Sequence, residues 1–158
     1  MTELFTWLEE SAMSTWVREA PTIWAFATIL TLHTFGMGVL VGASAVVSLR
    51  LLGVARTIPL AGLRTLFRVM WVGFWLNLVT GSVLFAADAS ARGTQGLFYV
   101  KLLFVATGVT TIILIKRRLY SAKADPVVVS GATKNLAILS LLVWVVAITA
   151  GRLLAYVQ

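Results

Sequence analysis

The chain has 158 residues, of which 59% are hydrophobic and only 12% are charged, and its mean hydropathy is +0.95. A typical soluble domain is about 45–50% apolar and about 25% charged, so this composition excludes a secreted, cytosolic or disordered protein and predicts an integral membrane protein. The 13 basic and 6 acidic residues give a formal net charge of +7, which in a membrane protein indicates topology more often than nucleic-acid binding. Cysteine is absent, which excludes disulfides, thiolate metal sites and cysteine nucleophiles.

Residues 2–19 form the first predicted element, an amphipathic helix. Apolar side chains recur there at helical spacing, and charged side chains, mostly acidic, occupy the opposite face. The apolar set is Leu4, Phe5, Leu8, Ala12 and Trp16. We expect this helix to lie along the membrane interface, with Trp7 and Trp16 at the depth of the lipid headgroups.

Four apolar stretches follow, each long enough to cross a bilayer, which takes about 20 residues. They cover residues 22–49, 69–87, 97–115 and 136–157. The short polar segment 88–95 predicts a tight external turn, and short connections make neighbouring helices antiparallel. The sequence therefore predicts an all-α fold: a single membrane domain over residues 1–158, built as an up-down four-helix bundle with an interfacial N-terminal helix.

Basic residues gather in two of the predicted loops, which share a side of the membrane if there are four spans. Nine of the 13 lie there: Arg50, Arg56, Arg64, Arg68, Lys116, Arg117, Arg118, Lys123 and Lys134. The positive-inside rule places these loops in the cytoplasm. We therefore expect a multi-pass protein of a bacterial inner membrane, with both termini on the periplasmic or extracellular side.

The single histidine, His33, stands about 11 residues into the first span, or roughly 16 Å from its outer end. Intramembrane ionisable residues usually have a function, and Gly36, one turn further along, leaves room for a neighbouring helix or a flat ligand. Asn77 lies near the same depth in the second span, and it is the predicted hydrogen-bonding partner of His33. The alternative is a structural histidine bonded to polar groups of the bundle.

Two further cations, Lys101 and Arg152, stand inside the outer parts of the third and fourth spans. They could snorkel to the outer headgroups, but the positive-inside rule does not favour cations there. Gly151 beside Arg152 suits a packed surface more than a lipid-facing one. We therefore predict an inward-facing polar cluster of Lys101, Arg152 and Asp88 above His33.

A basic cluster above one buried imidazole is the pattern that haem b requires, because the iron needs an axial ligand and the propionates need cations. His33 would bind the iron, Lys101 and Arg152 would hold the propionates, and the faces of Gly36 and Asn77 would accept the ring. The second axial position stays open between a five-coordinate iron, an unusual ligand and His33 of a second protomer. The resulting hypothesis is haem binding and electron transfer in membrane redox chemistry.

Two other functions stay open on the sequence alone. The chain could be a structural or assembly subunit of a larger membrane complex, in which the polar cluster serves packing. It could also transport a small cation or a metal, which would need an oligomer because one chain has too few polar residues for a path. Nothing in the sequence identifies a catalytic residue or a nucleic-acid interface.

Five short segments of the chain carry a family resemblance: residues 31–36 (TLHTFG), 40–42 (LVG), 49–53 (LRLLG), 98–103 (FYVKLL) and 150–156 (AGRLLAY). They resemble the corresponding segments of a family of uncharacterised bacterial four-helix membrane proteins. The resemblance covers nearly the whole chain and implies four spans preceded by a short amphipathic helix. It implies no particular activity.

A looser pattern, a histidine followed by glycine in the first span with Lys101-Leu102 opening the third, is similar to that of the HemJ family. These are haem-binding membrane protoporphyrinogen oxidases, although their arginine-rich start of the second helix has no counterpart here. The likeness implies that His33 is an axial ligand and Lys101 a functional lysine. The membrane domain of the CopD family of copper-resistance proteins has a similar helix with histidine and glycine.

Overall fold

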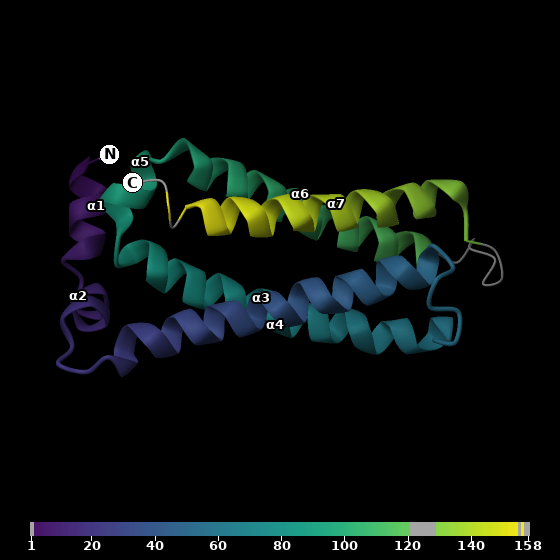
Figure 1. Cartoon of the computed structure of the whole chain (residues 1–158), viewed down its shortest axis with the longest axis horizontal. Helices are drawn as coiled ribbons and strands as arrows, with labels where there is room; N and C mark the ends of the chain where they lie inside the picture. The colour runs from purple at the N-terminus through teal and green to yellow at the C-terminus, as the bar shows by residue number, and fades with distance from the viewer. Residues whose placement is uncertain (1, 121–128, 155, 157–158) are drawn as a thin grey trace.

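The structure is a computed structural model, and it describes residues 2–120, 129–154 and 156 (Figure 1). These residues form helices and no strand. The helices are α1 (Thr2–Glu9), α2 (Ala12–Glu19), α3 (Trp24–Leu51), the 3-10 turn η1 (Leu60–Gly62), α4 (Leu63–Ala86), α5 (Ala89–Thr94), α6 (Gly96–Leu119) and α7 (Gly131–Leu153). The all-helical prediction is therefore confirmed for the part of the chain that the structure describes.

Four of these helices are long and apolar enough to cross a membrane: α3, α4 with η1, α6 and α7. They coincide with the four predicted spans, but α4, α6 and α7 begin earlier and α3 and α6 end later than predicted. α4 and α6 continue through their arginines and lysines because the backbone hydrogen bonds of a helix do not require apolar side chains. α7 begins at Gly131 because the Ser130 hydroxyl caps it by accepting from the Thr133 N–H at 3.3 Å. The predicted end of the fourth span at residue 157 and the loop residue Lys123 lie outside the described residues.

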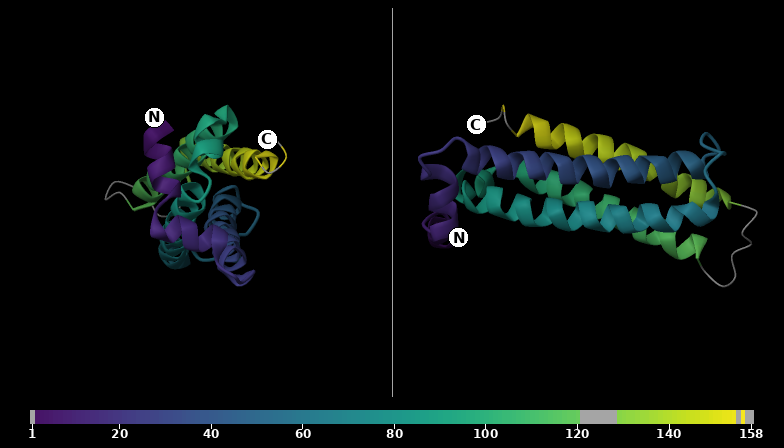
Figure 2. Two further views of the ribbon diagram at one scale, coloured as in Figure 1. Left: turned by 90° about the vertical axis from the view of Figure 1, so that its left-hand side faces the viewer. Right: turned by 90° about the horizontal axis from the view of Figure 1, so that it is seen from below.

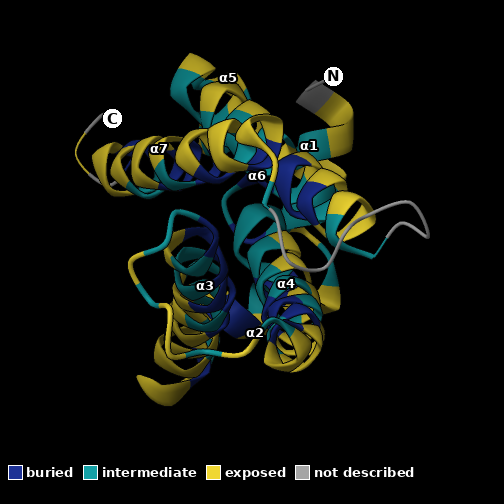
Figure 3. Ribbon diagram, turned by 90° about the vertical axis from the view of Figure 1, so that its right-hand side faces the viewer, coloured by how far each residue is buried: buried dark blue, intermediate teal, exposed yellow. Residues whose placement is uncertain are grey.

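The long helices pack as two antiparallel pairs, α3 with α4 and α6 with α7, and α3 also packs against α7 (Figures 1 and 3). The short helices α1 and α2 lie across one end of these pairs, beside α5 (Figure 2). We call this the capped end, and we call the end that holds the α3–α4 connection the opposite end. The arrangement makes the two ends of the molecule chemically different.

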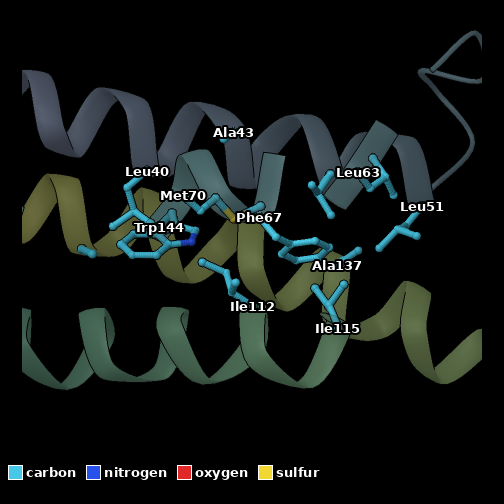
Figure 4. Close-up of a cluster of buried hydrophobic side chains, with 12 residues drawn as sticks. Leu40, Ala43, Leu51, Leu63, Phe67, Met70, Ile112, Ile115, Ala137 and Trp144 are labelled. Atoms are coloured by element: carbon cyan, nitrogen blue, oxygen red, sulfur yellow. The ribbon is translucent and has the colours of Figure 1, made fainter. Parts of the chain in front are cut away.

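A hydrophobic core fills the half of the molecule nearer the opposite end (Figure 4). Large buried side chains from all four long helices meet there, including Val47, Phe67, Ile115 and Trp144. The indole of Trp144 lies against Gly108, where an added Cβ would be 2.8 Å from Cζ2 of the ring. This tight packing leaves the capped half as the region where the two helix pairs enclose a cavity.

Two local predictions are wrong at the capped end. Residues 2–19 form two helices instead of one, because the Ser11 side chain accepts from the Ser14 N–H at 3.3 Å and so starts α2 afresh. Segment 88–95 is not a tight turn, since it contains α5. Asp88 precedes this helix with φ −144° and pairs with Arg92 at 2.9 Å, so Asp88 does not continue the inner face of α4.

Candidate functional site

A cavity of about 530 Å³ lies at the capped end, lined by residues of α2, α3, α4, α6 and α7 and by the segment around α5. Its apolar wall includes the rings of Phe26, Phe85 and Phe98. Its ionisable wall residues are Arg18, His33, Asp88, Arg92 and Lys101. Ligand and cofactor pockets typically measure about 300–1,000 Å³ and combine an apolar lining with a few polar groups, and this cavity has both properties.

His33 is held against α4 by hydrogen bonds of its ring nitrogen Nδ1 and of its backbone carbonyl. Its Nδ1 lies 3.1 Å from the Asn77 carbonyl oxygen and 3.1 Å from the Thr80 hydroxyl, and the Asn77 side-chain amide donates to the His33 carbonyl at 2.8 Å. The predicted pairing of His33 with Asn77 is therefore confirmed, and it runs through the backbone oxygen of each residue. The missing side chain of Gly81 makes room for the ring, because an added Cβ there would be 2.9 Å from Cε1.

These contacts decide which imidazole nitrogen carries the proton. The Asn77 carbonyl can only accept, and the Thr80 hydroxyl already donates to the Leu76 carbonyl at 2.6 Å. Nδ1 is therefore the donor, and in the neutral ring Nε2 keeps its lone pair. Nε2 makes no hydrogen bond to any described residue, and His33 lines the cavity. A histidine that binds a metal commonly donates its second N–H to a carbonyl in this way.

Nitrogen NMR on the ¹⁵N-labelled protein should confirm this tautomer, since the single histidine gives one pair of ring signals. We expect an N–H signal from Nδ1 and an unprotonated signal from Nε2 at neutral pH. Gly81→Ala should disturb this pattern because its methyl group would displace the ring from Asn77 and Thr80. A spectrum with the proton on Nε2 would contradict the assignment.

The cations that line the cavity differ in whether an acidic side chain neutralises their charge. Arg92 forms an ion pair with Asp88 at 2.9 Å and donates to the Leu154 carbonyl at 2.6 Å. Lys101 has its alkyl chain against Gly151, and its ammonium makes no hydrogen bond or ion pair with the described part of the chain. Arg18 donates to two backbone carbonyls, those of Ala87 and Glu9, at 3.4 and 2.9 Å. Lys101 and Arg18 therefore face the cavity without an ion pair, which favours an anionic ligand.

The prediction that Arg152 faces inward is wrong. Its side chain is exposed on α7 and does not line the cavity, although Gly151 beside it does. Arg18 and Arg92 take its place, and sequence reasoning assigned neither of them to the site. The sequence does contain a signal for these arginines. The capped end has more cations than the positive-inside rule leads one to expect on the outer side of a membrane.

Gly36 and Asn77 lie outside the wall of this cavity. An added Cβ on Gly36 would be 3.0 Å from the Asn77 nitrogen and 3.1 Å from the Gly73 carbonyl, so Gly36 lets α3 and α4 approach closely. Asn77 instead lines a second, smaller cavity of about 30 Å³, together with Met37 and Lys101. Lys101 thus borders both spaces. Met37 does not line the larger cavity.

Comparison with protein-family models, with curated proteins and with solved structures finds no match to this chain. Its function must therefore be argued from its own residues. Within the described residues, no group of three or more His, Cys, Asp and Glu side chains could hold a metal ion. His33, the single histidine of the chain, lines the cavity without such a group around it among the described residues.

Proposed function

We propose that the four long helices cross the membrane as an antiparallel bundle, with the capped end on the periplasmic or extracellular side of a bacterial inner membrane. Large apolar side chains remain exposed at mid-helix, such as Val72, Leu103 and Val145 at 60% or more, and lipid tails would cover them. The basic residues of the opposite end, including Arg68 and Arg117, support its cytoplasmic placement. Exposed Trp7 and Trp16 suit α1 and α2 to the outer interface.

In the cavity of about 530 Å³ at the capped end, the protein would bind haem b or a related tetrapyrrole and use it for electron transfer within the membrane. The observation that carries the proposal is His33, whose Nδ1–H is fixed by the Asn77 carbonyl at 3.1 Å while Nε2 has no partner among the described residues. A tetrapyrrole supplies its own nitrogen ligands to the metal, so one protein imidazole is enough to hold it. Bound haem would supply one-electron redox chemistry.

The other walls of the cavity match the remaining parts of such a ligand. Phe26, Phe85 and Phe98 offer apolar surface to a flat macrocycle, and the rings of Phe85 and Phe98 are already stacked at 5.0 Å between centroids. Lys101 and Arg18 would bind the two carboxylates, since neither cation has an ion pair within the described chain. Arg92 is less available because Asp88 neutralises it.

A spectroscopic experiment tests the proposal. The protein is purified in detergent from haem-replete cells, titrated with haemin, and examined by its reduced-minus-oxidised absorbance spectrum. We expect a Soret band and saturation at one haem per chain. A colourless preparation that takes up no haemin would exclude the function.

Lys101→Met should weaken haemin binding by about 10-fold or more, because a hydrogen bond to a charged group contributes about 1.5–3 kcal/mol. Methionine keeps most of the apolar volume against Gly151 and removes only the charge. The matched control is Lys116→Met, which removes an exposed lysine near the opposite end of α6. Titration of both variants with haemin measures the difference, and equal affinities would show that Lys101 does not contact the ligand.

Two glycines of α3 favour a second candidate function, that of a structural or assembly subunit. Gly38 and Gly42 are exposed, and an added Cβ would meet nothing within 4 Å at either position. Glycines at this spacing let a second transmembrane helix approach closely. This function predicts co-purification with a stable partner, a loss of that partner in Gly38→Leu, and a His33→Ala variant whose only defect is stability.

A further inference from the structure

The polar contact between α1 and α5 is made by one carboxylate and one serine. The Glu9 carboxylate accepts from the Ser90 backbone N–H at 2.7 Å and from the Ser90 hydroxyl at 3.0 Å. These hydrogen bonds, followed by the nearby Arg18 guanidinium, hold the pKa of Glu9 below its ordinary value. Glu9 is therefore ionised at neutral pH, and it joins the N-terminal segment to a helix 81 residues away along the chain.

An aromatic contact next to this carboxylate connects α1 to the cavity wall. The ring of Phe5 lies on Gly93 of α5, where an added Cβ would be 2.5 Å from Cε2. The same ring packs edge-on against Phe85, with 6.1 Å between centroids. Because Phe85 lines the cavity, Phe5 forms an outer layer over that wall.

The second half of the segment, α2, reaches the cavity directly through Arg18. Val17 and Ser14 are buried where α2 packs on α3 and α4. The link from α2 to α3, by contrast, is exposed at Pro21 and Thr22. The segment is thus joined to α3 by a short exposed link, packs on α3 and α4 through α2, and is fastened to α5 at its far end.

We propose that the α1–α2 segment is a movable cap over the cavity, and that it releases α5 when a ligand passes in or out. This inference rests on the proposed function only in taking the cavity to be the binding site. Release requires the loss of the Glu9–Ser90 hydrogen bonds and the withdrawal of Phe5 from Gly93. The cap then swings on the link at residues 20–23, which exposes Val17 and breaks the hydrogen bond from Arg18 to the Ala87 carbonyl, and Arg18 leaves the cavity wall.

A cysteine-labelling experiment tests the cap without any haem, because the chain has no cysteine of its own. Leu84→Cys places a thiol on the cavity wall, and the rate of its labelling by a membrane-impermeant maleimide is measured in lipid nanodiscs. Adding Glu9→Ala and Phe5→Ala together to this variant should raise the labelling rate about 10-fold, because two charge-assisted hydrogen bonds and a ring contact are lost. Glu10→Ala, an exposed neighbour, is the control and should leave the rate unchanged.

A second thiol distinguishes cap opening from general unfolding. Val47→Cys lies in the core near the opposite end, where Val47 is 2% exposed, and its labelling should stay slow in every variant. An unchanged rate at Leu84→Cys, or an equal rise at both thiols, would overturn the cap. Failure of haem binding in the titration would leave this result intact, so the two proposals fail separately.

Discussion

His33→Ala is expected to lower the affinity for haemin by more than about 100-fold, because loss of a second-shell partner alone costs about 10–100-fold. The variant removes the imidazole whose Nε2 would bind the iron, while the aromatic and cationic walls of the cavity remain. The Soret band of the co-purified protein should therefore disappear. Any haemin that still binds should lack the spectrum of a histidine-ligated iron.

The same substitution also removes contacts between helices, so its effect on folding needs a control. His33 donates through Nδ1 to α4, and Asn77 donates to the His33 carbonyl at 2.8 Å. Asn77→Ala breaks that second hydrogen bond at the same depth and leaves the imidazole in place. It should lower the thermal stability by an amount similar to His33→Ala while it retains most of the haemin affinity.

Rescue by imidazole separates a ligand from a structural histidine. Free imidazole can enter the space left by His33→Ala and bind the iron, and it should restore the Soret band without raising the melting temperature to that of the parent protein. If Asn77→Ala and His33→Ala lose haemin equally, and if imidazole restores neither, then His33 acts through packing and the haem proposal fails.

The parts of this structure that could be predicted from the sequence follow from long hydrophobic runs. Four such runs give four long helices, because a segment of about 20 mainly apolar residues has few other stable forms. The depth of His33 and that of Asn77 follow in turn from counting along two antiparallel helices, and their hydrogen bond agrees with that count. Gly36 also indicated where a neighbouring helix approaches, since an added Cβ there would be 3.0 Å from the Asn77 nitrogen.

The rotation of each helix could not be predicted in the same way. α7 is apolar on nearly every face, so its pattern does not indicate whether Arg152 turns toward α6 or toward lipid. The identity of the cavity cations depends instead on contacts between distant segments. Arg18 arrives through the packing of α2, and Arg92 arrives because α5 forms where a turn was predicted.

Gly73→Ala is expected to destabilise the protein by about 1–2 kcal/mol. Its new Cβ would lie 2.8 Å from the Leu40 nitrogen and 2.9 Å from the Gly36 carbonyl, and both atoms belong to the backbone of α3. Backbone cannot move aside as a flexible side chain does, so α3 and α4 must separate at a typical overpacking cost of about 1–3 kcal/mol. The better helix propensity of alanine returns up to about 1 kcal/mol of this.

Gly42→Ala is the matched control, because it changes the same atoms on a face of α3 where nothing lies within 4 Å. It should be neutral or stabilising, so the melting temperatures of the two variants in detergent should differ by about 4–8 °C. Gly73→Ala should also loosen the bond between His33 Nδ1 and the Asn77 carbonyl, since it separates the helices that carry them. A shift of the Nδ1 signal toward that of a free imidazole, seen in Gly73→Ala and not in Gly42→Ala, would show that the close approach of α3 and α4 orients the candidate ligand. Equal melting temperatures and unchanged nitrogen signals would instead mean that the two helices tolerate a wider spacing without consequence for the site.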